Sequence, residues 1–326
     1  LLTITVITGF IEFGKGYFED DQLIFFLGYT QMAPFTLIIL LVFWGAFNRL
    51  FNVRQSKRLL GTVDQGALIA SLISFFTIPF VLEILEKSMG SSEKAVESLY
   101  TISLISIIVF TVLFYVLSSY FSNERWSLKR ERELNHKLSI AGFFKNKYVL
   151  FLSLFVIASI TALNFVDYSF LTAANNFFTG DRADTLPKFL SYFEATVVIF
   201  SFAFQTFAAD KVIEDYGLKV SVLVNPVLIA LFTVVALVIG LTFGYSPDSS
   251  SFIIFFIMIA MSKLFVLSVR ESLDEPSFKL YQLPFDTDIK IDVQTKLEGI
   301  VTGFATMIAG AIILLISQVK IFDLIY

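Results

Sequence analysis

Apolar residues dominate eight long stretches of this chain, and short charged segments separate one stretch from the next. Each stretch has about 20 residues, enough for a helix to cross a hydrocarbon layer of roughly 30 Å. Backbone groups in lipid must be bonded internally, so only helices or a closed barrel can span. The stretches are too long and too continuously apolar for barrel strands. We therefore predict an all-α polytopic membrane protein with spans at 23–47, 62–86, 98–122, 148–172, 188–209, 218–243, 251–273 and 295–317.

The basic residues between these spans are distributed unevenly. One alternating set of loops and adjoining helix ends holds 17 Lys and Arg, whereas the opposite set holds 6. Cytoplasmic loops of membrane proteins carry an excess of Lys and Arg. We therefore place the first set in the cytoplasm. Its loops are 48–61, 123–147, 210–219 and 274–294.

The longest predicted loop, 123–147, is rich in both charge signs and is expected to form an amphipathic helix that joins two halves of the protein. The chain opens and closes within apolar runs, which we interpret as cut helices. The series then corresponds to helices 3 to 12 of a twelve-helix transporter, truncated at both ends. Two halves around a midplane cavity are typical of a major-facilitator-type fold. The predicted organisation is 1–122 for the remainder of an N-terminal six-helix bundle, 123–147 for a cytoplasmic linker and 148–326 for a C-terminal bundle.

Composition narrows the chemistry. The chain has no Cys and a single His, His136, which lies in a charged loop. Thiol chemistry and a histidine-based metal site or catalytic dyad are therefore excluded. No Walker motif is present, so the chain is not expected to hydrolyse ATP itself. We predict a protein that is not an enzyme, with no cofactor, no bound metal and no nucleic-acid partner.

Ionisable side chains within the predicted spans are the strongest functional pointers, because a charge in lipid is costly unless it faces a polar cavity or a partner. Lys263 lies near the middle of the seventh span, Asp167 in the fourth and Glu194 in the fifth, while Glu298 opens the eighth. We expect Lys263 to face a cavity, where it would suit an anionic substrate or neutralise Asp167. Polar neighbours that could share the cavity include Asn164 and Gln31.

Each acid also has a purely structural interpretation. Asp167 could form an ion pair with Lys263 that has no transport role. Glu194 could lie near the outer interface if its span begins at Leu186. Glu298 could be an acid placed near a helix N-terminus, where the helix dipole favours negative charge.

Three short motifs carry a resemblance to a known family. They are Phe43-Trp44-Gly45 followed by Asn48 and Lys57-Arg58, then Asn164-Phe165-Val166-Asp167, and then Asp274-Glu275-Pro276 followed by Tyr281, Pro284 and Asp286. In these places the chain resembles the ATP/ADP translocases of plastids and obligate intracellular bacteria, of which it would be a divergent bacterial member. The likeness covers essentially the whole chain in layout.

This resemblance implies exchange of nucleotides or related organic anions across a bacterial inner membrane by a secondary transporter. The expected partners are the lipid bilayer and an anionic small molecule such as ATP or ADP. Divergent members can also carry a soluble C-terminal domain or bind a protein partner, and the resemblance leaves room for either beyond the present chain. Arg270 falls on a basic position of the family. Together, the candidate substrate-binding residues are Lys263, Asp167, Asn164, Glu194, Arg270, Glu298, Gln31 and Asn48.

Two positions depart from the family pattern. Where the family has a lysine four residues after its helix-7 acid, this chain has Leu171, and the family's helix-11 lysine falls at about Thr306. Phosphate recognition relies on positive charge, and this chain lacks the lysine at both of these family positions. The alternative function is therefore a membrane scaffold, anchor or sensor that retains the transporter fold without transport.

Overall fold

A computed structural model describes residues 2–14, parts of 26–43, 53–120, 143, 145–244, 251–281 and 292–317, with isolated positions at 247, 249 and 285. Within these residues the chain is helical and contains no strand. Seven of its helices are long and apolar enough to cross a membrane. They correspond to the last seven predicted spans, which confirms an all-α polytopic membrane protein. The first predicted span, 23–47, lies mostly outside the described residues.

The chain divides into two compact units, of which the first comprises Leu1–Ala70 and Phe80–Arg132. It contains α1 (Leu2–Gly14), α4 (Ser92–Tyr120) and most of α3 (Val53–Met89). Helix α1 packs against α4, and α1 buries Ile4, Thr8 and Ile11, which share one face of the helix. The predicted linker helix at 123–147 lies largely outside the described residues, so the boundary between two bundles stays a prediction.

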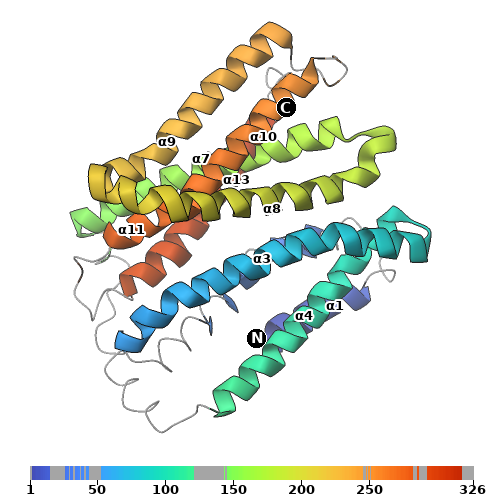
Figure 1. Ribbon diagram of the computed structural model, residues 1–326, viewed down its shortest axis with the longest axis horizontal. Coiled ribbons are helices and arrows are strands. Elements are labelled where there is room, and N and C mark those ends of the chain that lie inside the picture. The colour runs from blue at the N-terminus through green and yellow to red at the C-terminus, as the bar shows by residue number, and fades with distance from the viewer. Residues whose placement is uncertain are drawn as a thin grey trace. The chain divides into compact units, whose positions relative to one another are not determined.

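The second unit comprises Ser71–Pro79 and Glu133–Tyr326. Its central helix is α10 (Phe252–Val269), which contacts α7, α8 and α9 (Figure 1). Within the span that contains α10, 56% of an 18-residue apolar stretch is buried, whereas the corresponding share is 28% for the spans that contain α7 and α8. The other elements are α7 (Lys147–Phe177), η1 (Gly180–Thr185), α8 (Leu186–Phe204), η2 (Gln205–Ala209), α9 (Asp210–Phe243), η3 (Arg270–Asp274), α11 (Glu275–Tyr281), η4 (Lys296–Val301) and α13 (Thr302–Ser317).

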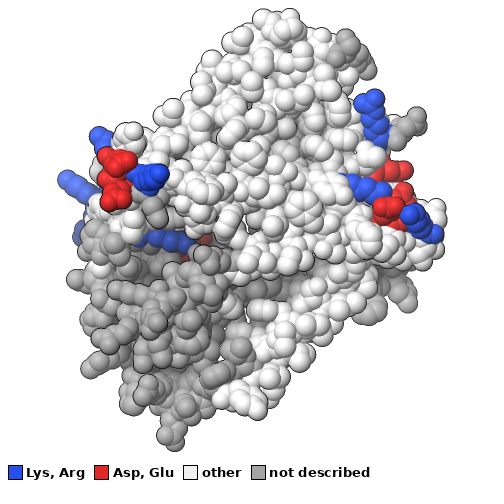
Figure 2. Space-filling view, viewed as in Figure 1, with Lys and Arg blue, Asp and Glu red and all other residues white. Residues whose placement is uncertain are grey.

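Helix α9 shows why this unit needs lipid around it. Its exposed residues form a stripe of aliphatic side chains at helical spacing, and each is more than half exposed: Val227, Leu231, Val234, Val238 and Leu241. Such a continuous apolar surface would be unstable in water. In Figure 2 the charged side chains of the described residues gather at the two ends of the helices, and the surface between them is almost uncharged. This distribution is the one expected of a membrane-spanning helical bundle.

Several helices depart from regular α geometry near one end. Gly217 has a φ of 75° and interrupts α9, a backbone conformation that glycine adopts without steric penalty. Segments η2, η3 and η4 are π-helical. Helical structure also continues into three of the predicted cytoplasmic loops: α3 begins at Val53, α9 begins at Asp210, and α10 continues through η3 into α11 as far as Tyr281. Parts of the predicted loops 48–61, 210–219 and 274–294 are therefore helical.

Candidate functional site

The candidate site is an ion-paired group of three side chains, Lys263, Asp167 and Glu194, which we call the Lys263 triad. The ammonium Nζ of Lys263 lies 2.9 Å from Oε1 of Glu194 and 3.4 Å from Oδ1 of Asp167. The Lys263 side chain is only 8% exposed, whereas those of Glu194 and Asp167 are 32% and 45% exposed. The triad therefore buries its cation and leaves its two carboxylates partly accessible.

Three different helices supply the triad at similar depth. Asp167 is ten residues before the end of α7, Glu194 is eight residues after the start of α8, and Lys263 is eleven residues after the start of α10. At 1.5 Å per residue these positions lie about 12 to 17 Å from the helix ends. A hydrocarbon core is roughly 30 Å thick, so the triad is placed near the middle of the predicted membrane layer.

Phenylalanine rings line the apolar side of the triad. The Lys263 ammonium lies 4.5 Å from the ring centroid of Phe170 and 5.8 Å from that of Phe193. The two rings stack on each other with centroids 4.4 Å apart. An ammonium over an aromatic face is attracted to its quadrupole, more strongly where water is excluded. Phe170 is completely buried, so the rings help to hold the ammonium in place.

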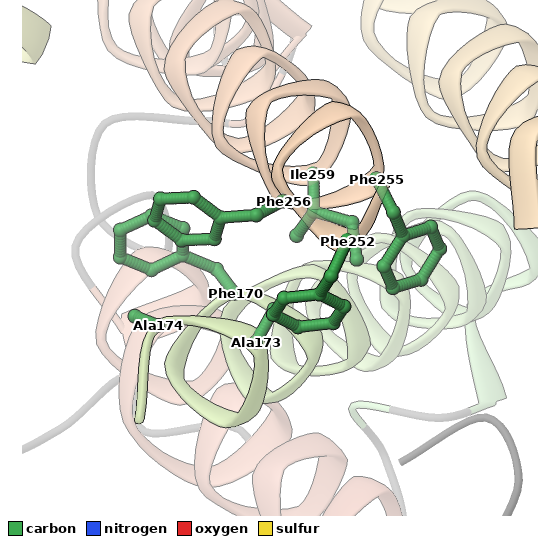
Figure 3. Close-up of a cluster of buried hydrophobic side chains, with 7 residues drawn as sticks. All are labelled: Phe170, Ala173, Ala174, Phe252, Phe255, Phe256 and Ile259. Atoms are coloured by element: carbon green, nitrogen blue, oxygen red, sulfur yellow. The ribbon is translucent and has the colours of Figure 1, made fainter. Parts of the chain in front are cut away.

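Phe170 also belongs to the largest aromatic cluster of the unit. Its buried members come from α7 and α10 and are Phe170, Ala173, Ala174, Phe252, Phe255, Phe256 and Ile259 (Figure 3). Helix α8 adds Phe189 and Phe193 at the edge. Ile259 and Phe256 precede Lys263 by one and two turns of α10. The cluster thus packs together the three helices that carry the triad, and it fixes the positions of the charged side chains relative to one another.

The electrostatics of the triad constrain what it can bind. A buried charge must be paired, because an isolated ion in a low-dielectric interior is very costly. Here one ammonium faces two carboxylates, so with all three groups ionised the triad carries one surplus negative charge. An anion that reached Lys263 would compete with the two carboxylates that already pair with it. The arrangement can therefore exchange one anionic partner of Lys263 for another.

Other predicted site residues lie elsewhere or have local partners. Arg270 pairs with Glu275 at 3.1 Å between Nε and Oε1, and Glu298 accepts a hydrogen bond of 2.9 Å from Gln294. The Asn164 amide donates to the carbonyl of Ile160 on its own helix at 2.8 Å.

The remaining two predicted residues come from the N-terminal part of the chain. Gln31 belongs to the first unit, and its Oε1 atom is buried without a hydrogen-bond partner among the described residues. Asn48 lies outside those residues. Of the eight candidates the structure brings three into direct contact, and substrate binding by any of them stays a prediction.

The structure also bears on the purely structural interpretations of Asp167 and Glu194. The ion pair between Asp167 and Lys263 is present, and Glu194 also pairs with Lys263. Helix α8 does begin at Leu186, but this start still leaves Glu194 two turns inside the helix. Its contact with Lys263 shows that Glu194 points into the bundle.

A second buried polar group was not predicted from the sequence. It consists of Asp274, Asn225 and Ser277, which we call the Asp274 cluster, and these residues are 5%, 0% and 0% exposed. A nearby hydrogen bond of 2.7 Å runs from the Ser201 hydroxyl to Oε2 of Glu271. A sequence signal for this group was available in Asn225, a polar residue next to Pro226 within a predicted span. Asp274 followed the predicted end of its span and was interpreted as part of a loop.

The comparisons with known proteins agree with this architecture. A model of the TLC ATP/ADP transporter family matches residues 24–321, a range that includes all seven membrane-spanning helices and the Lys263 triad. Searches of curated proteins and of solved structures gave no match. The family match covers most of the chain and confirms the resemblance deduced from the motifs. The chain therefore belongs to the TLC ATP/ADP transporter family.

Proposed function

We propose that this protein is a secondary transporter that moves nucleotides or related organic anions across a bacterial inner membrane by alternating access. Membership of a nucleotide transporter family supports transport as the general function. The observation that carries the specific proposal is Lys263, a buried cation held at mid-depth by two partly exposed carboxylates. Intramembrane ionisable residues generally mark substrate or ion pathways.

In the proposed mechanism Lys263 alternates between two kinds of anionic partner. Between transport events Asp167 and Glu194 hold the ammonium, as in the present structure. A nucleotide phosphate group that reaches the triad displaces one carboxylate and takes its place beside Lys263. Because the carboxylates are partly exposed, the displaced group can regain solvation or take up a proton.

The charge distribution supports an orientation for this cycle. The ends of the helices that carry η2, η3 and η4 belong to the set of loops and helix ends that is rich in Lys and Arg. By the excess of positive charge in cytoplasmic loops, these ends face the cytoplasm. The aromatic cluster around Phe256 then lies on the opposite side of the triad, toward the outer face.

Uptake of radiolabelled ATP and ADP into proteoliposomes that contain the purified protein tests the proposal. We expect saturable uptake, and Lys263→Ala should reduce it by at least 100-fold because the buried cation is lost. Lys219→Ala, which removes an exposed lysine of the same unit, is the matched control and should transport normally. Normal uptake by a folded Lys263→Ala variant would exclude Lys263 as the anion contact. Absence of nucleotide uptake by the folded wild-type protein would contradict nucleotide transport.

A further inference from the structure

The Asp274 cluster contains three buried oxygen atoms without a hydrogen-bond partner in the part of the chain that the structure describes. They are Oδ1 of Asp274, Oδ1 of Asn225 and Oγ of Ser277. The Asn225 amide lies 3.5 Å from Oδ2 of Asp274, and Ser277 follows Asp274 by three residues on the same helical face. Buried polar atoms are almost always satisfied, so three such atoms on neighbouring elements favour a bound ligand at this place.

The charge around Asp274 is also unbalanced. The sequence from Arg270 to Glu275 holds one base and three acids. Arg270 pairs with Glu275, and Glu271 accepts from Ser201. None of the ion pairs among the described residues involves Asp274. An ionised carboxylate with this degree of burial requires a positive partner.

Three candidate ligands differ in what they satisfy. A water molecule could bond all three oxygen atoms, but it would leave the negative charge uncompensated. A proton on Asp274 would remove the charge, but it could be shared with only one further oxygen. A small cation compensates the charge and can be coordinated by all three oxygen atoms at once. With a single carboxylate present, a monovalent ion makes the cluster neutral, whereas a divalent ion would leave a buried positive charge.

The backbone around the cluster is suited to ion binding. Asp274 is the last residue of the π-helical segment η3, and Asn225 lies on α9 two turns after the interruption at Gly217. Irregular helical turns leave carbonyl groups outside the regular hydrogen-bond ladder, and π-helical turns are frequent at functional sites. Interrupted membrane helices coordinate monovalent ions in other transporters by means of such carbonyls.

We propose that Asp274, Asn225 and Ser277 form a binding site for one alkali-metal cation. The ion neutralises the buried carboxylate and joins α9 to the segment where α10 continues through η3 into α11. The site is separate from the Lys263 triad, which lies eleven residues earlier along the same continuous helix. The proposal of a cation site does not rest on nucleotide transport. Cation binding is measured by thermal unfolding and nucleotide uptake by transport into proteoliposomes, so failure of one proposal can be told from failure of the other.

Thermal unfolding of the purified protein in detergent tests this site. The wild-type protein is compared in NaCl, in KCl and in choline chloride at equal ionic strength and constant pH. A ligand that binds only the folded state raises the unfolding temperature as its concentration rises. We expect a saturable increase of about 2 to 5 °C in at least one alkali salt relative to choline.

Variants of the cluster identify the site. Asp274→Asn should abolish the increase, and Ser277→Ala, a milder change, should move its midpoint to a severalfold higher salt concentration. Asp184→Asn removes an exposed carboxylate elsewhere and should behave as the wild type. Equal unfolding temperatures in all three salts would overturn the proposal, and so would an increase that persists in Asp274→Asn. A response to pH alone would also overturn it and would indicate a protonated Asp274.

Discussion

The Lys263 triad and the Asp274 cluster both place ionised groups within one continuous helix, but they balance charge in different ways. In the triad a buried cation has two carboxylates from neighbouring helices, and these carboxylates remain partly exposed. In the cluster a buried carboxylate has the Asn225 amide 3.5 Å away, and none of the ion pairs among the described residues includes it. The triad can satisfy itself from the chain, whereas the cluster requires a positive partner from outside.

This contrast predicts opposite effects of charge removal at the two places. The largest effect is expected for Lys263→Met, which leaves Asp167 and Glu194 facing each other without a cation. Removal of one partner of a buried ion pair is strongly destabilising, and we expect a loss of roughly 3 kcal/mol because the two acids are partly exposed. Thermal unfolding in detergent measures the loss.

A triple variant provides the control for this prediction. Lys263→Met combined with Asp167→Asn and Glu194→Gln removes every charge of the triad, so it should recover much of the lost stability. It should still fail to transport nucleotides if Lys263 contacts the substrate. Recovery of both stability and uptake would show that the triad is only structural.

The second prediction has the opposite sign. In choline chloride, where no alkali cation is present, Asp274→Asn should raise stability by about 1 to 2 kcal/mol because it removes an uncompensated buried charge. In the alkali salt that binds, the wild type should regain or exceed the stability of the variant. Unfolding curves of both proteins in the two salts measure the crossing. Destabilisation of Asp274→Asn in both salts would contradict the contrast between the two regions.

The sequence identified the members of the triad separately, because each is a charge within an apolar span. The contact among the three side chains could not be predicted from the sequence, because it depends on the rotation of α7, α8 and α10 about their axes. That rotation is set by packing of Phe170, Phe256 and their neighbours, and many phenylalanines at helical spacing are compatible with several such rotations.

The Asp274 cluster was missed for a different physical reason. Hydropathy places the end of a span where the sequence becomes polar, and the adjacent acids Asp274 and Glu275 lie directly after the predicted end at 273. The helix instead continues to Tyr281. Asp274 is buried beside Asn225 of α9, Glu271 accepts a hydrogen bond from Ser201 of α8, and Glu275 pairs with Arg270. The seven spans follow from apolar length alone and were therefore predictable, whereas π-helical turns have no clear sequence signal.

The third prediction distinguishes the two acids of the triad. Glu194 is nearer to Lys263 and less exposed than Asp167, so its attraction to the ammonium is screened less by solvent. We expect Glu194→Gln to reduce nucleotide uptake about tenfold, equivalent to about 1.4 kcal/mol, and Asp167→Asn to reduce it less. Uptake rates of the two variants, normalised to the amount of protein, decide the order. Equal rates or a reversed order would show that contact distance does not govern the exchange.

The smallest predicted effect concerns the aromatic wall of the triad. Phe170→Leu keeps an apolar side chain but removes the ring that lies 4.5 Å from the Lys263 ammonium. Phe256→Leu is the matched control, because Phe256 belongs to the same buried cluster and no cation lies over its ring among the described residues. In a double-mutant cycle with Lys263→Met we expect a coupling energy of about 0.5 to 1 kcal/mol for Phe170. The corresponding value for Phe256 should be near zero, and equal coupling would show that the rings act only through packing.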